Sequence, residues 1–292
     1  MRNISNSEVS TWLSCRNKYR YAFDLDLEPK KRSDPLTRGT IGHDALDVYY
    51  KTLQAGVEPT HVRAMDAATK RLGTIMSQPD APFDLILDVR RILELYWAYY
   101  EGDPNWEILE VEEMHNLPLN EDYSMPTRLD LLVRDKTDGK IALVDHKFYY
   151  DMPNPDKLAL NVQFPKYIGA LAEAGIKVDY CLLNVLRYRK LKNPALSDVF
   201  KRYKVTVSPA KIRRALHTHI LASQEITEYR SLPEAVRPSV AIPVFNDMVC
   251  KHCDFANLCQ SEFDGGDINY LIETDYQKNS YGYNDPTTEG LL

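Results

Sequence analysis

The sequence predicts an α/β (α+β) fold, because strand-like and helix-like segments alternate along its 292 residues. The strongest strand signal is a β-hairpin over 127–150, where two apolar runs flank a polar loop that contains Asp138-Gly139. Segments 107–114 and 178–187 are further strand candidates, and several longer segments have the apolar spacing of helices. A hydrophobic content of 44% suits one large or two small globular domains.

Composition also narrows the function class. The net charge of −6 argues against a protein that coats nucleic acid through its overall field, although a local basic groove stays compatible with it. No apolar run approaches the ~18 residues of a membrane span, and Met1–Ser10 has no secretory signal. We therefore expect a cytoplasmic protein with no membrane partner. Five cysteines, an odd number in a reducing compartment, favour metal or thiol chemistry over disulfides.

The N-terminal part of the chain is predicted to be helical. Ser5 and Glu8 have the spacing of a capping box that opens the first helix. After a basic loop over 28–35, three further helices are expected, over 38–54, 60–78 and 84–101. Gly39 and Gly42 lie near the start of the second helix, where they indicate a close approach of the backbone to another group.

Two more helices are predicted in the C-terminal half, over 157–174 and from about 209 to 229. Pro165 should kink or locally break the first of them, and Gly175 is expected to end it. A basic run follows the last strong strand candidate and comprises Arg187, Arg189, Lys190 and Lys192. Segment 232–243 is proline-rich and is expected to be extended.

The hairpin places charged residues in an apolar setting. If Arg134 and Ile141 flank the turn, antiparallel pairing sets Asp130 opposite Asp145 and places Lys147 diagonal to Asp130. Burial of unpaired charge is costly, so the pattern has two interpretations. One is an ion cluster on a solvated face of the sheet, and the other is a divalent-metal site with a lysine beside it.

A cysteine cluster has the spacing C-x2-C-x5-C and comprises Cys250, Cys253 and Cys259. This spacing places three thiolates around one metal centre, which requires a fourth ligand. Cys15 is the strongest candidate, because Cys181 lies in an apolar strand segment. Such a centre would join the N-terminal helix to the C-terminal segment. Spacing alone leaves iron–sulfur and zinc open, and His252 is compatible with a zinc variant.

Together these features resemble the PD-(D/E)xK nuclease superfamily, specifically RecB-like, Cas4-like exonucleases that carry a four-cysteine [4Fe–4S] cluster. The residues behind the resemblance follow in order as His43, Asp130, Asp145-x-Lys147 and Gln163-x-x-x-Tyr167, with one cysteine before them and three after. The match extends from about Val9 to Cys259. It implies a restriction-endonuclease-like core, in which a central mixed β-sheet is flanked by helices.

The resemblance also implies a role for each of these residues. Mg²⁺ or Mn²⁺ would be bound by three side chains and one backbone carbonyl, those of His43, Asp130, Asp145 and His146. Lys147 would be the catalytic lysine. A [4Fe–4S] cluster, with zinc as the less favoured occupant, would be ligated by Cys15, Cys250, Cys253 and Cys259.

Other positions complete the comparison with that family. Gln163 and Tyr167 would form a helical motif that positions the lysine or the DNA. An upstream acidic ligand, common in the family, would be Glu112 or its neighbour Glu113, and the sequence leaves that choice open. Thr127 departs from the family, which commonly has a glycine before the first aspartate.

The implied function is that of a metal-dependent DNA exonuclease, acting on single-stranded or duplex ends in recombination, repair or replication, with a helicase or recombinase as partner. The alternatives are a catalytically decayed or zinc-stapled DNA-binding scaffold, and an endonuclease or RNA nuclease of the same fold. The oligomeric state is not indicated.

The predicted domains are an N-terminal helix and basic loop (1–37), a nuclease core with a helical insertion at about 57–101 (38–231), a cluster-binding segment (232–263) and an acidic tail (264–292).

Overall fold

The computed structural model describes residues 1–58, 60–158 and 160–279 of the chain. The chain forms two compact units that interleave along the sequence. Among the described residues, unit 1 comprises Met1–Arg32, Asn116–Thr127 and residues 212–279, and unit 2 comprises Ser33–His115 and Arg128–Lys211. The domain limits given above remain a prediction. No described helix combines the length and the apolar content needed to cross a bilayer.

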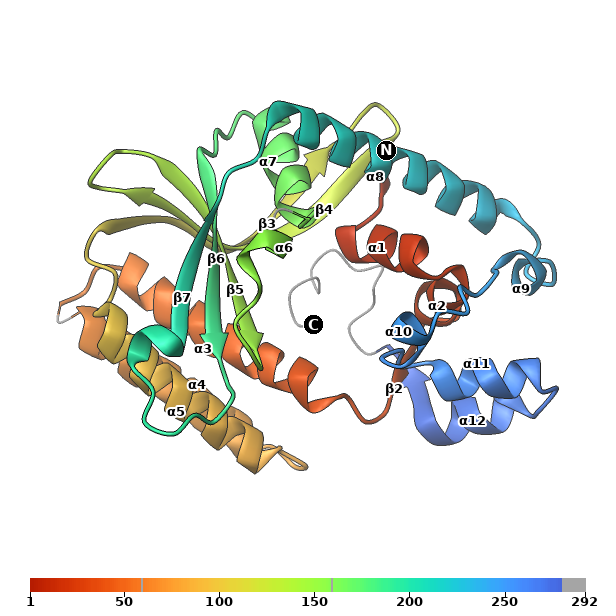
Figure 1. Ribbon diagram of the computed structural model, residues 1–292, viewed down its shortest axis with the longest axis horizontal. Helices are drawn as coiled ribbons and strands as arrows, with labels where there is room; N and C mark the ends of the chain where they lie inside the picture. Colours follow the sequence, from red (N-terminus) through yellow and green to blue (C-terminus); the bar gives the residue numbers. More distant parts are fainter. Residues whose placement is uncertain (59, 159, 280–292) are drawn as a thin grey trace. The chain divides into compact units, whose positions relative to one another are not determined.

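A six-stranded mixed sheet is the central element of the fold (Figure 1). Its main path runs β1-β4-β5-β6-β7, with β3 paired to β4. The strands are β1 (Arg2–Asn3), β3 (Trp106–Pro118), β4 (Tyr123–Asp135), β5 (Ile141–Tyr149), β6 (Tyr180–Arg187) and β7 (Phe200–Val205). Pairing is antiparallel for β4–β5 and β6–β7 but parallel for β5–β6. Together with its flanking helices, this sheet confirms the predicted fold class.

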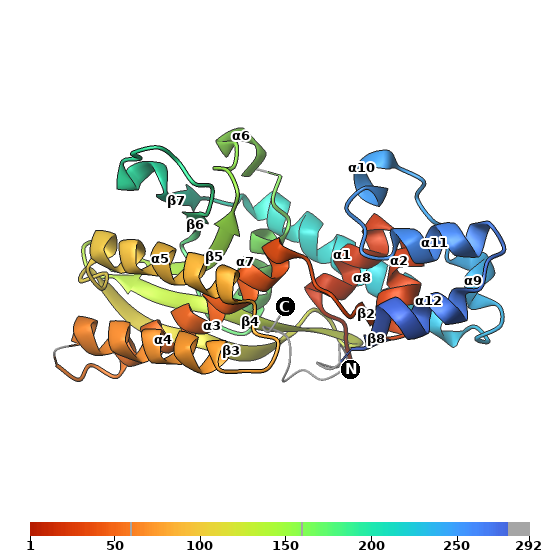
Figure 2. The ribbon, with the colours of Figure 1, turned by 90° about the horizontal axis from the view of Figure 1, so that it is seen from below.

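Unit 2 contains the helices between the strands of the sheet. These helices are α3 (Asp34–Gln54), α4 (Thr60–Met76), α5 (Phe83–Tyr100), α6 (Pro155–Leu158) and α7 (Gln163–Glu173), with a 3-10 turn at Leu196–Asp198. α3, α4 and α5 lie along the sheet (Figure 2). Their buried side chains share one core with alternate residues of β4 and β5, among them Val133 and Val144. Because side chains alternate along a strand, Asp145 and Lys147 point to the opposite face of β5.

Unit 1 is largely helical. Its helices are α1 (Asn6–Ser14), α2 (Arg16–Tyr19), a π-helical turn (Arg20–Asp24), α9 (Arg237–Val240), α10 (Asp247–Cys250), α11 (Ala256–Phe263) and α12 (Ile268–Asp275), and α8 (Pro209–Ser231) extends into it from unit 2. Strands β2 (Leu27–Pro29) and β8 (Tyr276–Lys278) form an antiparallel pair. α11 and α12 lie side by side (Figure 1).

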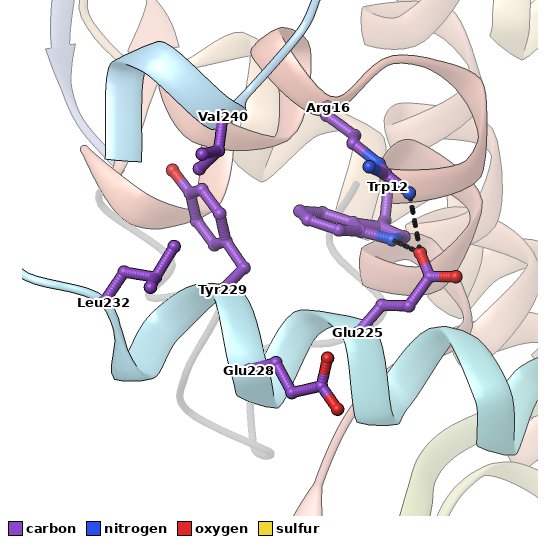
Figure 3. A pocket seen from close by; sticks show the side chains of 7 residues that line it. All are labelled: Trp12, Arg16, Glu225, Glu228, Tyr229, Leu232 and Val240. Carbon is purple, nitrogen blue, oxygen red and sulfur yellow. Dashed lines mark hydrogen bonds and ion pairs between the residues drawn. The ribbon is translucent and has the colours of Figure 1, made fainter. Parts of the chain in front are cut away.

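The first helix is fixed against α8 by polar contacts around an aromatic ring. The Trp12 Nε1–H donates to Glu225 Oε2 at 2.8 Å, and Arg16 Nη2 donates to the same oxygen at 2.9 Å (Figure 3). The Trp12 ring packs on Tyr229 with centroids 5.2 Å apart. A surface pocket of about 300 Å³ lies over these side chains, between α1, α8 and α9. Ser5 caps α1 as predicted, since its hydroxyl accepts from the Glu8 backbone N–H.

The structure corrects several local predictions. The helix expected over 157–174 is two helices, α6 and α7, and Pro165 causes no kink because it lies in the first turn of α7, where no partner for its missing N–H is needed. Segment 232–243 is not wholly extended, since it contains α9. The first part of the predicted acidic tail forms α12 and β8, and residues 280–292 lie outside the described residues.

Candidate active site

The hairpin of β4 and β5 carries two of the acidic residues of the site. Arg134 pairs with Ile141 beside the turn, which confirms the predicted register. One step beyond the last paired residues, the two strands carry Asp130 and Asp145. At this point the Asp130 Oδ2 accepts a 2.7 Å hydrogen bond from the backbone N–H of His146. The carboxylate of the first strand is therefore held directly by the backbone of the second.

Three potential metal ligands from three elements converge on one point. They are His43 of α3, Glu112 of β3 and Asp130 of β4, whose ligand atoms all lie within 4.8 Å of one another. His43 Nδ1 is 3.4 Å from Asp130 Oδ2 and 4.0 Å from Glu112 Oε1. Two carboxylates this close repel each other unless a cation lies between them, and an imidazole with carboxylates suits Mn²⁺ as well as Mg²⁺. The geometry thus fits a divalent ion.

Glu112, and not Glu113, contributes to this group. Glu113 is exposed, whereas the Glu112 side chain is only 9% exposed and faces His43. The backbone at Glu112 has a φ of +51°, a left-handed conformation that is unusual for a residue in a strand. The distorted backbone of β3 therefore places Glu112, and not Glu113, beside His43. No pattern of residue types in the sequence predicts this distortion.

The proton affinities of these groups reflect their mutual charges. Burial would raise the pKa of Asp130, but the charges of His43 and Lys147 outweigh it and lower that pKa. Burial would lower the pKa of His43, but Asp130 and Glu112 outweigh it and raise that pKa. For Glu112, burial dominates and raises the pKa. The site thus stabilises positive charge at its centre.

Lys147 lies against the second aspartate. Its Nζ donates to Asp145 Oδ1 at 3.0 Å, while Asp145 Oδ2 is buried without a hydrogen-bond partner among the described residues. Burial raises the pKa of Asp145. Burial would lower the pKa of Lys147, but Asp145 and Asp130 outweigh it and raise that pKa, so the amine stays charged. An ammonium group beside an unpartnered carboxylate oxygen is an arrangement that can bind both a metal ion and a phosphate.

The predicted helical motif lies beside Lys147. Gln163 opens α7, and its Nε2 donates to the hydroxyl of Tyr167 at 2.9 Å. The Tyr167 phenol interacts electrostatically with Lys147 and Asp145, and burial raises its pKa. The phenol is therefore neutral: its oxygen can accept a hydrogen bond from the Lys147 ammonium group, and its O–H can donate one to a substrate.

A buried polar network supports the backbone at His146, and sequence reasoning missed it. Asn184 Nδ2 lies 2.7 Å from His146 Nδ1, and the Tyr50 ring stacks on the imidazole with centroids 5.4 Å apart. Arg202 donates to Asn184 Oδ1 at 3.3 Å and pairs with Asp103. Burial lowers the pKa of His146 to about 3, so the ring is neutral. The packed ring thus holds in place the residue that lies between Asp145 and Lys147 in the chain, and the predicted role of the His146 backbone carbonyl remains a prediction.

Gly42 positions His43. A Cβ at Gly42 would lie 2.2 Å from ring atoms of Phe148, so only glycine allows α3 to approach β5 at this point. Gly39, by contrast, has no other group within 4 Å of the site a Cβ would occupy. The predicted close approach is confirmed for Gly42 and wrong for Gly39, and it places the neighbouring His43 over the hairpin.

The four predicted cysteine ligands of unit 1 share one pocket. Its volume is about 160 Å³, and it is lined by Cys15, Cys250, Cys253 and Cys259 among mainly apolar side chains. Burial raises the pKa of Cys253 and of Cys259, and Asn17 Nδ2 donates to Cys259 Sγ at 3.4 Å. Cys181 is fully buried in β6, in agreement with its interpretation as a core residue. Among the described residues, the ligand atoms that converge within 4.8 Å are those of His43, Glu112 and Asp130 and not these sulfurs, so a metal centre shared by the four cysteines remains a prediction.

The fold and the acidic site define a nuclease of the restriction-endonuclease-like class. Residues 3–260 match the PD-(D/E)XK nuclease superfamily, so the chain belongs to that superfamily and is a metal-dependent nuclease. No curated protein shows significant similarity to the chain.

Proposed function

We propose that the chain is a DNA exonuclease of the RecB-like, Cas4-like type, which hydrolyses phosphodiesters at DNA ends during recombination, repair or replication. The observation that carries this proposal is the convergence of His43, Glu112 and Asp130 beside the Asp145–Lys147 pair. A helicase or recombinase that exposes DNA ends would supply its substrate.

Mg²⁺ or Mn²⁺ would be held by the three convergent side chains together with the free oxygen of Asp145. Such an ion, when bound, acidifies a water molecule and polarises a phosphoryl oxygen. The protein residues supply the rest of the chemistry. Lys147, kept charged by two carboxylates, would orient the attacking water and balance the charge that develops on the phosphate. The Tyr167 hydroxyl, fixed by Gln163, would position the lysine or the scissile phosphate.

We further propose that Cys15, Cys250, Cys253 and Cys259 ligate a [4Fe–4S] cluster. The shared pocket of four thiols supports this assignment. The test is anaerobic purification followed by absorbance spectroscopy and iron and sulfide assays. A broad band near ~400 nm with about four irons per chain is expected. A colourless protein that holds one zinc would show instead that the four cysteines bind a structural zinc ion.

The exonuclease assignment is tested with end-labelled linear DNA and with circular single-stranded DNA of the same sequence. We expect Mg²⁺- or Mn²⁺-dependent release of nucleotides from linear DNA, with the circle left intact. Cleavage of the circle would instead establish an endonuclease, and cleavage of RNA alone an RNA nuclease. Absence of cleavage under all these conditions, with DNA binding retained, would favour a DNA-binding scaffold.

A further inference from the structure

A patch of aromatic and basic side chains lies where β5 and β6 end, close to the catalytic lysine. Tyr150 directly follows β5, three residues after Lys147, which corresponds to roughly 10 Å along an extended chain. Tyr188 directly follows β6, and its backbone N–H donates to Tyr149 O at 2.8 Å. The sheet therefore fixes Tyr150 and Tyr188 beside each other, at the ends of the adjacent strands β5 and β6, of which β5 carries Asp145 and Lys147.

The two tyrosines form a ring pair that is open to solvent on one side. Their centroids are 5.6 Å apart at an interplanar angle of 65°, and Tyr150 is 55% exposed. An exposed aromatic side chain held by a second ring loses little conformational freedom on binding, which makes it an effective contact for a flat ligand. No described core cluster includes the Tyr150 ring.

Cations surround the ring pair. The Arg189 guanidinium lies 5.5 Å from the Tyr150 centroid, and that of Arg38 lies 4.2 Å from the Tyr188 centroid. The neighbouring ion pairs are Arg187–Asp151, Arg189–Asp151, Arg38–Asp88 and Lys190–Asp88. Four cations are thus balanced by only two carboxylates, an excess of two positive charges on a chain whose net charge is −6.

Rings that are interleaved with excess cations match the two chemical parts of a nucleic-acid strand, a flat base and a phosphate. Paired bases are already stacked within a duplex, so only an unpaired base can use the Tyr150 face. We propose that Tyr150, Tyr188 and Arg189 form a stacking surface for an unpaired strand at the end of the β-strand that carries Lys147. The inference rests on the proposed nuclease function and extends it, because it predicts a preference for unpaired DNA ends and assigns that preference to named residues.

The test compares binding of a 12-nucleotide oligo-dT with that of an abasic oligomer of the same length and charge. Fluorescence anisotropy is measured on the full chain carrying Lys147→Met, in Mg²⁺, so that no cleavage occurs. Tyr150→Ala should weaken binding of oligo-dT by roughly 5- to 100-fold and leave binding of the abasic oligomer unchanged. Tyr150→Phe should bind like the parent. Tyr99→Ala is the matched control, since Tyr99 is a 40% exposed tyrosine of α5 in the same unit.

Each other outcome has a defined meaning. Equal binding by Tyr150→Ala and the parent, or equal weakening for both oligomers, would overturn the stacking surface. Competition by polyglutamate as strong as that by oligo-dT would assign the patch to an acidic protein partner instead. If Tyr150→Ala cleaves DNA with an unchanged KM, the stacking surface is rejected but the nuclease function is retained. If binding depends on Tyr150 but the wild-type chain cleaves nothing, the stacking surface is retained and the proposed function is rejected.

Discussion

The two units assemble polar sites by different physical means. In unit 2, sheet pairing and a close helix approach hold acidic and basic groups that already balance one another, as Lys147 does with Asp145. In unit 1, short helices and loops surround thiols such as Cys253 whose pKa is raised by burial. We therefore expect the site of unit 2 to form before a metal ion binds. If the proposed cluster binds in unit 1, we expect that pocket to become rigid only when the metal displaces the thiol protons.

The largest effect is expected at Lys147, the proposed catalytic lysine. Lys147→Met should reduce cleavage by roughly 10²- to 10⁴-fold, because the charge that faces the phosphate is lost while the aliphatic stem remains. The variant should still unfold cooperatively, since the sheet holds the site. Steady-state cleavage of end-labelled DNA and circular dichroism measure the two properties. Lys201→Met, an exposed lysine of β7, is the control and should cleave normally. Undiminished cleavage by Lys147→Met would show that the active site does not include Lys147.

The second prediction concerns the cysteine pocket. Cys253→Ala should lose the bound metal and destabilise unit 1 by several kcal/mol, because metal binding contributes folding energy to such sites. Metal analysis and hydrogen exchange of unit 1 peptides report these effects. Cys181→Ala, in the core of β6, should retain the metal and cost only about 1 kcal/mol. If both variants keep the metal, the difference drawn between the two units is wrong.

A smaller effect is expected from the ion pair that joins the N-terminal segment to α11. Arg20 Nη2 donates to both oxygens of Glu262 at 2.5 Å, and the Tyr21 hydroxyl donates to it at 2.6 Å. Glu262→Gln should destabilise unit 1 by roughly 1–3 kcal/mol, because Arg20 is left buried without its counter-charge. Glu225→Gln should cost less, since the Arg16–Glu225 pair is about half exposed.

The same carboxylate should make unit 1 sensitive to acid. Burial would raise the pKa of Glu262, but the hydrogen bonds from Tyr21 and Arg20 outweigh it and lower that pKa below its ordinary 4.5. Its stabilisation is therefore complete above about pH 4.5 and is lost as the pH falls through the lower value of the folded state. The melting temperatures of the wild type and of Glu262→Gln should therefore converge in that acidic range. A difference in melting temperature that stays the same at all pH values would contradict this linkage.

The smallest effects separate two glycines on one helix. Gly42→Ala should destabilise unit 2 by about 1–3 kcal/mol and reduce cleavage, because its methyl group would overlap the Phe148 ring and displace His43. Gly39→Ala, one turn earlier in α3 and without a neighbour, should instead stabilise the helix by about 0.5–1 kcal/mol. Chemical denaturation measures both. Equal effects would show that the approach of α3 to β5 does not depend on Gly42.

Sequence reasoning reached the parts of the fold that depend on local patterns. Alternation and the Asp138-Gly139 turn predict the hairpin and its register, and apolar spacing predicts α4 and α5 to within two residues of their observed ends. It failed where tertiary geometry decides. The left-handed backbone at Glu112 and the contact between Asn184 and His146 join residues whose separation in sequence carries no signal. The same limit explains why Tyr150 and Tyr188 did not stand out in the sequence.

The distorted backbone at Glu112 has a consequence for engineering. A non-glycine residue with a φ of +51° costs roughly 1–2 kcal/mol, and here it also buries a carboxylate beside Asp130. Glu112→Gly would relieve both costs. Directed evolution that selects only for heat resistance would therefore favour changes at this position and yield thermostable proteins without nuclease activity, so any such screen should include a cleavage step.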